Sequence, residues 1–160
     1  IATSILAGQY IGRGKTKICH KIVFNVFTIA FLYCGSLTLI VVLFPSVFVN
    51  MFGGGTLAFE PIRIMVMNLI LVFPIFILVD ILHEIYGAVL NGAGDTKYKM
   101  YVLLSLTVIA MVSEYLAVRF FEGDLLTVFL LESLKIAFLG LFYYRRYKLG
   151  IWKSIELINQ

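Results

Sequence analysis

The sequence predicts an all-α protein of the polytopic membrane class, and three observations lead to this fold class. Hydrophobic residues make up 61% of the 160 residues, whereas charged residues make up only 14%. Soluble domains carry about a quarter charged residues and about half apolar ones at most. The apolar residues gather in long stretches, each sufficient for the roughly 20 helical residues that span a bilayer core. A membrane β-barrel would instead show short segments of alternating hydrophobicity.

The predicted elements follow one another along the whole chain. They are the end of a helix at 1–11, spans at about 22–52, 61–90, 98–121 and 125–144, and a polar tail at 145–160. Because the first residues are typical of a helix already under way, we expect the chain to be part of a longer protein. The two cysteines, Cys19 and Cys34, stand at unrelated positions and indicate neither a disulfide nor a metal site.

Two prolines lie within the predicted spans. Pro45 falls near the outer end of the first span, where it costs little. Pro74 lies in the middle of the second span, where the loss of one backbone hydrogen bond usually kinks a helix. Such helices are tolerated in membranes when neighbouring groups satisfy the freed carbonyl.

The connections between the spans differ in charge and predict the orientation. Ten of the 13 Lys and Arg residues lie in three segments on one side, at 12–21, 91–99 and 145–153. The opposite side has the loops at 53–55 and 121–124, with only Arg63 and Arg119 near them. The positive-inside rule predicts that the basic side and the C-terminus are cytoplasmic, in the inner membrane of a bacterium. The net charge of +4 follows from this asymmetry and does not indicate nucleic-acid binding.

The second span carries three ionisable residues, Asp80, His83 and Glu84, well inside its apolar stretch. A charged side chain at the bilayer centre costs at least ~2.5 kcal/mol, so three in five residues indicate a function. At helical spacing they share one stripe with other residues of the span. The stripe consists of Phe73, Phe76, Asp80, His83, Glu84, Gly87 and Asn91. We expect it to face protein or a watery cavity.

This stripe predicts a cation site, at which a carboxylate binds a proton or a sodium ion part-way across the membrane. Desolvation disfavours the charged form of a carboxylate and so makes protonation easier. The alternative is that Asp80 and Glu84 pair with a base from another helix and only fix the packing. One histidine beside two carboxylates on a single helix, without a further Cys or His, does not indicate a metal site. We expect neither a metal nor an organic cofactor.

Three more charges lie in the last two spans. Glu132 and Lys135 are three residues apart and can neutralise each other on one helix face. Alternatively, Lys135 faces the same cavity as Asp80. Glu114 in the third span is expected near the outer interface, in a structural role.

Two short motifs do not carry a function. Gly14-Lys15-Thr16 resembles the end of a phosphate-binding loop, but five residues separate Gly8 from Gly14 where the motif needs four. Gly8 and Gly12 have the spacing that lets two membrane helices approach closely. Near a helix end, this spacing is equally a turn signal.

Three segments together resemble the multidrug and toxic-compound extrusion (MATE) transporters. They are Ala7-Gly8-Gln9-Tyr10-Ile11-Gly12-Arg13-Gly14, Leu90-Asn91-Gly92-Ala93-Gly94-Asp95-Thr96 and Tyr144-Arg145-Arg146-Tyr147-Lys148-Leu149-Gly150-Ile151-Trp152-Lys153. The family has a Gly-Gln-x-x-Gly-x-Gly loop, a Leu-Arg-Gly-x-Gly-Asp-Thr loop and a basic Gly-x-Trp-Lys tail. The chain departs from the family at Asn91, which replaces an arginine, and at Arg13 and Lys15, which replace small and acidic residues.

The resemblance implies a fold of twelve helices in two six-helix lobes, of which this chain, 1–160, would be a partial C-terminal lobe. Its four spans would be the ninth to twelfth helices, and its partner would be the N-terminal lobe of the same parent protein. In the NorM branch, a cation-site aspartate lies twelve residues before the first glycine of the tenth helix's loop. Asp80 has that position relative to Gly92. The drug cavity would lie between the lobes.

The resemblance and the residues together predict export of drugs or organic cations by antiport with protons or sodium ions. Asp80 would bind the ion with help from His83 or Glu84. Phe73, Phe76, Tyr86 and Lys135 would face the substrate cavity, where aromatic rings attract lipophilic cations. The expected partners are membrane lipid and small cationic molecules.

Three alternatives to the antiporter remain, and one of them is that the chain is only a scaffold half with no activity of its own. A flippase for lipid-linked sugars of the same superfamily would need a ring of basic residues, and only Lys135 lies deep in a span. An integral-membrane enzyme, such as an acyl transferase using His83 with Asp80, would need a nucleophile motif that the sequence does not show. We therefore do not expect an enzyme.

Overall fold

The computed structural model describes residues 1–53 and 60–154. Its elements are α1 (Ala2–Gly12), α2 (Thr16–Leu43), α3 (Pro45–Gly53), α4 (Glu60–Gly92), α5 (Thr96–Phe120), α6 (Leu125–Leu149) and a short 3-10 helix, η2 (Ile151–Ser154). No strand occurs among the described residues, which confirms the all-α fold class. The helices α2, α4, α5 and α6 are long and apolar enough to cross a membrane. Gly54 and Gly55 of the expected outer loop lie outside the described residues.

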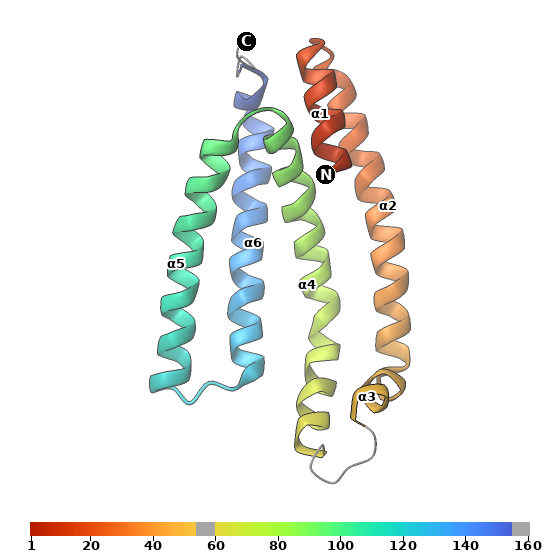
Figure 1. Ribbon diagram of the computed structural model, residues 1–160, viewed down its shortest axis with the longest axis vertical. Coiled ribbons are helices and arrows are strands. Elements are labelled where there is room, and N and C mark those ends of the chain that lie inside the picture. The colour runs from red at the N-terminus through yellow and green to blue at the C-terminus, as the bar shows by residue number, and fades with distance from the viewer. Residues whose placement is uncertain (54–59, 155–160) are drawn as a thin grey trace.

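The four long helices stand side by side, with α4 in the middle (Figure 1). Helix α4 packs against α6 on one side and against α2 and α1 on the other, whereas α5 packs mainly on α6. The turns α1–α2 and α4–α5 and the C-terminal η2 lie at one end of the bundle, and α3 and the α5–α6 loop at the other. The segments that carry the basic residues are therefore together in space.

The first predicted span, 22–52, is divided into two helices. Helix α2 ends at Leu43, Phe44 leaves the helical conformation with φ −124° and ψ 50°, and α3 begins at Pro45. A proline disfavours the helical conformation of the residue before it but fits the first position of a helix. Pro45, which the sequence predicts to cost little near the end of the first span, therefore ends α2 and starts α3.

The last long helix extends further than the predicted span 125–144. Helix α6 continues through the basic residues Arg145, Arg146 and Lys148 and stops at Gly150, which has a left-handed φ of 71°. Cations in the last turn interact favourably with the negative end of the helix dipole, and glycine adopts the left-handed conformation easily. Part of the expected tail is thus a helical extension of the span.

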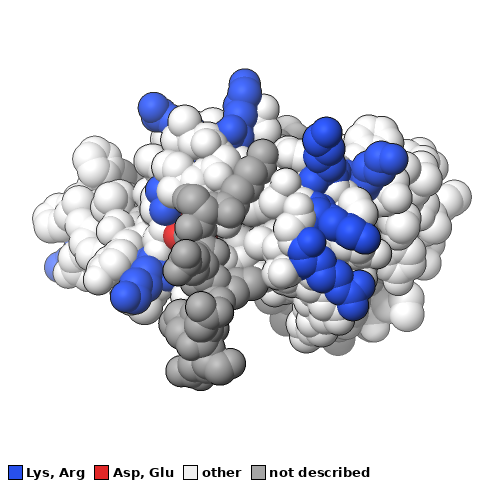
Figure 2. Space-filling view, turned by 90° about the horizontal axis from the view of Figure 1, so that it is seen from above, with Lys and Arg blue, Asp and Glu red and all other residues white. Residues whose placement is uncertain are grey.

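The basic end is held together by an ion pair between a buried carboxylate and a half-buried guanidinium. Asp95, in the α4–α5 turn, is only 6% exposed, and the Nε atom of Arg146 lies 2.7 Å from its Oδ2 atom. The Arg146 guanidinium also lies over the ring of Tyr98, 4.6 Å from its centroid. Figure 2 shows several Lys and Arg side chains spread over this end of the molecule and very little acidic surface beside them. The ion pair fixes the α4–α5 turn to the end of α6.

The tail folds back on the same end through aromatic side chains. Trp152 is buried, and its indole Nε1 donates a hydrogen bond to the carbonyl oxygen of Tyr147 at 2.7 Å. The two rings stack with centroids 5.4 Å apart, and the Tyr147 hydroxyl contacts the Nδ1 atom of His20 on α2. These contacts connect η2, α6 and α2.

Two glycines allow α1 to approach the end of α4 at backbone distance. A Cβ atom on Gly8 would lie 2.9 Å from the carbonyl oxygen of Gly92, and a Cβ atom on Gly92 would overlap the carbonyl oxygen of Ser4. Small residues at such contacts are typical of membrane helix pairs. Gly8 therefore serves a helix contact.

We predict that Gly92→Ala destabilises the protein by about 1–3 kcal/mol, since overfilling a packed contact forces the backbones apart. Thermal unfolding of the protein in detergent measures this loss. Gly35→Ala is the matched control, because a Cβ atom there meets no atom within 4 Å. Equal unfolding temperatures for the two variants would contradict the close α1–α4 contact.

Asp124 caps the N-terminus of α6 and gives a pH-dependent prediction. Its carboxylate accepts hydrogen bonds from the backbone N–H of Thr127 at 2.9 Å and from the Thr127 hydroxyl at 2.8 Å, which lower the pKa of Asp124. A depressed pKa contributes stability at neutral pH that is lost as the pH falls through the folded-state value. Asp124→Ala should therefore lower the unfolding temperature at pH 7 and make progressively less difference below about pH 4. A difference that does not change with pH would contradict the charged cap.

Candidate cation site

Helix α4 brings the three ionisable residues of the second span together. Asp80 lies twelve residues before the last residue of the helix, Gly92, which is about 18 Å along its axis. The helix is continuous through Pro74, six residues earlier. Proline has no N–H, so the carbonyl oxygen of Ile70 lacks its usual partner in the helix. The candidate site thus lies on an unbroken helix, and Asp80 is six residues after the proline that removes one backbone hydrogen bond.

The imidazole of His83 lies between the two carboxylates. Its Nδ1 atom is 3.7 Å from Oδ1 of Asp80 and 3.8 Å from Oε1 of Glu84. One ligand atom from each of the three residues lies within 4.8 Å of the other two. Carboxylate oxygens and an imidazole nitrogen at these separations can take up a cation or exchange a proton. The structure therefore brings together all three residues that were predicted to bind the ion.

The packing of α6 determines the position of His83. The imidazole stacks on the ring of Tyr143 with centroids 5.6 Å apart. Gly140 lies directly against the backbone of His83. The His83 side chain is 16% exposed, and its Nδ1 atom is buried with no hydrogen-bond partner among the described residues. A buried polar atom without a partner carries a desolvation cost. A cation bound at this position would give the Nδ1 atom a partner.

The two carboxylates are more open than the histidine. The side chain of Asp80 is 38% exposed and that of Glu84 is 71% exposed. Glu84 also lines a cavity of about 300 Å³ together with Ser4, Asn91 and Lys99. Neither carboxylate has a Lys or Arg partner among the described ion pairs. The described contacts thus do not supply the base that a purely structural role would require.

Two predicted cavity residues continue this face of α4. Phe73 and Phe76 stack with ring centroids 6.0 Å apart, and Phe76 contacts Phe129 of α6 at 5.2 Å. Both rings are partly exposed, one and two turns before Asp80. An aromatic surface therefore lies next to the carboxylates.

Tyr86 lies apart from this group. It lines a groove of about 350 Å³ between α4 and α6, together with Val79, Leu82 and Tyr144. Its ring contacts those of Tyr144 and Tyr147, each with centroids 5.2 Å away. Tyr86 follows Asp80 by six residues, which places the two side chains about 120° apart around the helix axis. Tyr86 and Asp80 therefore lie on different faces of α4.

Lys135 also belongs to another group of charges. Its ammonium pairs with Glu132 on the same helix, as the spacing of three residues predicted. Glu114 of α5 lies close enough to interact electrostatically with both residues, and its Oε1 atom is buried without a hydrogen-bond partner among the described residues. The spacing predicted the pair of Glu132 and Lys135 but not that Glu114 joins it, because no spacing along the chain shows that α5 and α6 are neighbours. The single signal was a carboxylate inside an apolar span.

The comparisons with known proteins agree with this arrangement. A protein-family comparison matches residues 1–116 to the MatE family, and this range includes α1 to α4, all three residues of the candidate site and most of α5. Comparisons with curated proteins and with solved structures gave no match. The match covers well over half of the sequence. The protein is therefore a multi-pass membrane protein, and the chain belongs to the MatE family of transporters.

Proposed function

We propose that the protein exports drugs or toxic organic cations by antiport with protons or sodium ions. The observation that carries the proposal is the group of Asp80, His83 and Glu84 on α4 in a chain of a transporter family. Ionisable residues inside membrane spans are expensive and usually mark ion pathways. Here the group has no basic partner among the described ion pairs, so an ion from outside the protein can neutralise it.

In this mechanism, the coupling ion binds to Asp80 and neutralises it. Helix α4 has a missing backbone hydrogen bond at Pro74, so its bend can differ between the ion-bound and ion-free states. An ion shifts this equilibrium only by its difference in affinity for the two states. Binding on one side of the membrane and release on the other then drive alternating access.

The substrate would compete for the same face of α4. Phe73 and Phe76 offer an aromatic surface beside the Asp80 carboxylate. Lipophilic cations bind both to aromatic faces and to negative charge. Displacement of the coupling ion by such a cation would link the two fluxes.

The alternatives receive less support. Lys135 pairs with Glu132, so this deep cation is not free for the pyrophosphate of a flippase substrate. For a membrane enzyme, His83 would have to activate a nucleophile. Its Nδ1 atom has no hydrogen-bond partner in the described part of the chain, and no hydroxyl or thiol contacts it there.

The proposal also includes the place of this chain in the whole transporter. We place it in the C-terminal lobe of a NorM-like protein, opposite an N-terminal lobe of the same parent. The basic end would face the cytoplasm of a bacterial cell, because nine described Lys and Arg residues of the segments 12–21, 91–99 and 145–153 gather there. The large apolar exposure of the helices would be covered by lipid and by that lobe.

We predict that Asp80→Asn abolishes ion-coupled efflux. The assay follows a fluorescent cationic dye leaving cells that express the full-length protein, under imposed proton or sodium gradients. The asparagine cannot bind or release the coupling charge, so we expect the gradient-driven rate to fall at least 100-fold. Whichever gradient drives the wild type identifies the ion.

The matched control is Glu122→Gln, which removes a carboxylate from the exposed α5–α6 loop and should leave efflux unchanged. Gradient-driven efflux that persists in Asp80→Asn would leave Asp80 with a structural role only. Absence of dye efflux from the wild type under both gradients would favour the flippase.

A further inference from the structure

The first 59 residues have an unusual charge balance. They include Arg13, Lys15, Lys17 and Lys21 but no Asp or Glu. All four side chains are exposed, and none has an ion-pair partner in the described part of the chain. At the same end of the molecule, the half-buried Arg146 is neutralised by the buried Asp95. The α1–α2 turn therefore carries cationic charge that the described structure does not use.

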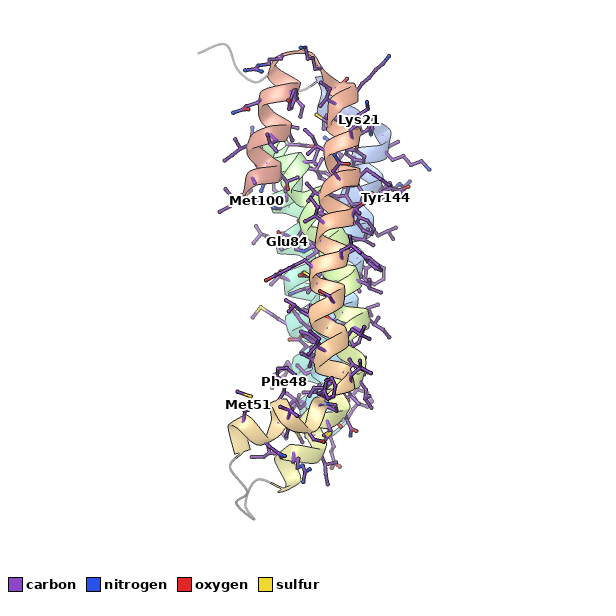
Figure 3. All side chains as sticks on the ribbon, turned by 90° about the vertical axis from the view of Figure 1, so that its right-hand side faces the viewer. Lys21, Phe48, Met51, Glu84, Met100 and Tyr144 are labelled. Atoms are coloured by element: carbon purple, nitrogen blue, oxygen red, sulfur yellow. The ribbon has the colours of Figure 1, made fainter. Side chains whose placement is uncertain are left out.

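Below this turn, one face of α2 changes from cationic to apolar. Lys17 and Lys21 are one turn apart, and Phe24 and Phe31 continue the same stripe at helical spacing. Phe24 is 70% exposed and Phe31 is 46% exposed. Figure 3 shows α2 on the surface turned to the viewer, with Lys21 near its upper end. We call this face the α2 stripe.

The α2 stripe leads into a groove between α2 and α4. The groove has a volume of about 230 Å³, and its lining includes Phe31, Gly35 and Leu39 of α2 and Pro74, Ile77 and Leu78 of α4. Position 35 borders open space in the groove, because a Cβ atom on Gly35 would meet no atom within 4 Å. Cationic residues, exposed aromatic rings and an apolar groove thus follow one another along a single helix face.

The dimensions of this face match one bilayer leaflet. Lys21 and Gly35 are fourteen residues apart, about 21 Å along the helix. One leaflet, with its headgroup region, is roughly 20–22 Å thick. A lipid with its phosphate at Lys21 would therefore place its acyl chain beside Phe24 and Phe31 and reach the groove at Gly35.

We propose that an anionic phospholipid binds along the α2 stripe, with its phosphate on Lys17 and Lys21 and one acyl chain in the α2–α4 groove. Charge complementarity selects an anionic headgroup, since no acidic side chain lies in the first 59 residues to repel it. The apolar groove selects a lipid over a soluble anion. The bound chain would contact the helix that carries Pro74 and the candidate cation site.

The test is a lipid titration of the protein in detergent, followed by native mass spectrometry. Phosphatidylglycerol and phosphatidylcholine with identical acyl chains are the probes. We expect phosphatidylglycerol to bind at least tenfold more tightly. The double variant Lys17→Gln with Lys21→Gln should lower its affinity about thirtyfold, given the usual contribution of each basic residue near a lipid surface. Gly35→Leu should weaken both lipids, because its side chain fills the groove.

The matched control is the double variant Lys97→Gln with Lys148→Gln, which removes the same charge from exposed positions at the same end. It should leave the affinity for phosphatidylglycerol unchanged. An equal loss in both double variants would show attraction by overall charge only and would overturn the site. Glycerol phosphate binding as tightly as the lipid would also overturn it, as would wild-type affinity in Gly35→Leu. None of these outcomes depends on dye efflux.

Discussion

Helix α4 contacts each of the other five helices, and different parts of its surface meet different partners. The end of α4 approaches α1 so closely, at Gly8 and Gly92, that a larger residue at either position would clash with the other helix. One side packs on α6, where Tyr143 stacks on the ring of His83 and Gly140 lies against the His83 backbone. The opposite side forms the groove with α2, and the face between them carries Asp80 and Glu84. A change in the bend of α4 would therefore affect the other five α-helices.

Charges at the basic end fall into two groups with different consequences. The buried Asp95 pairs with the half-buried Arg146 and fixes a turn to a helix end, and the stack of Tyr147 and Trp152 adds the tail. Removal of Arg146 would leave the buried Asp95 carboxylate without its partner, which is destabilising. The cations of the α1–α2 turn have no such partner in the described chain and remain available to the membrane. The basic end of the molecule thus contains both a charge pair that holds helices together and exposed cations that are free of such pairing among the described residues.

The candidate site was predictable because its members lie on one helix. Asp80, His83 and Glu84 are three and four residues apart, so helical periodicity alone places them on one face. The same reasoning gave the pair of Glu132 and Lys135, which the structure confirms. It did not place Tyr86 in a groove with Tyr144, nor Glu114 beside Glu132, because both depend on which helix faces α6.

The sequence by itself determined the membrane class, the four long helices and the polar stripe of α4, since each follows from composition and periodicity along a single segment. Only the tertiary structure decided that α5 packs on α6, and that α2 and α4 pack together with a groove between them beside Gly35 and Pro74. These helix contacts cannot be read from the sequence because lipid is as apolar as the interior of the bundle. A hydrophobic face on a membrane helix therefore does not show whether it meets lipid or another helix. Side-chain shape and small residues decide that, and their effect appears only when the helices are packed together.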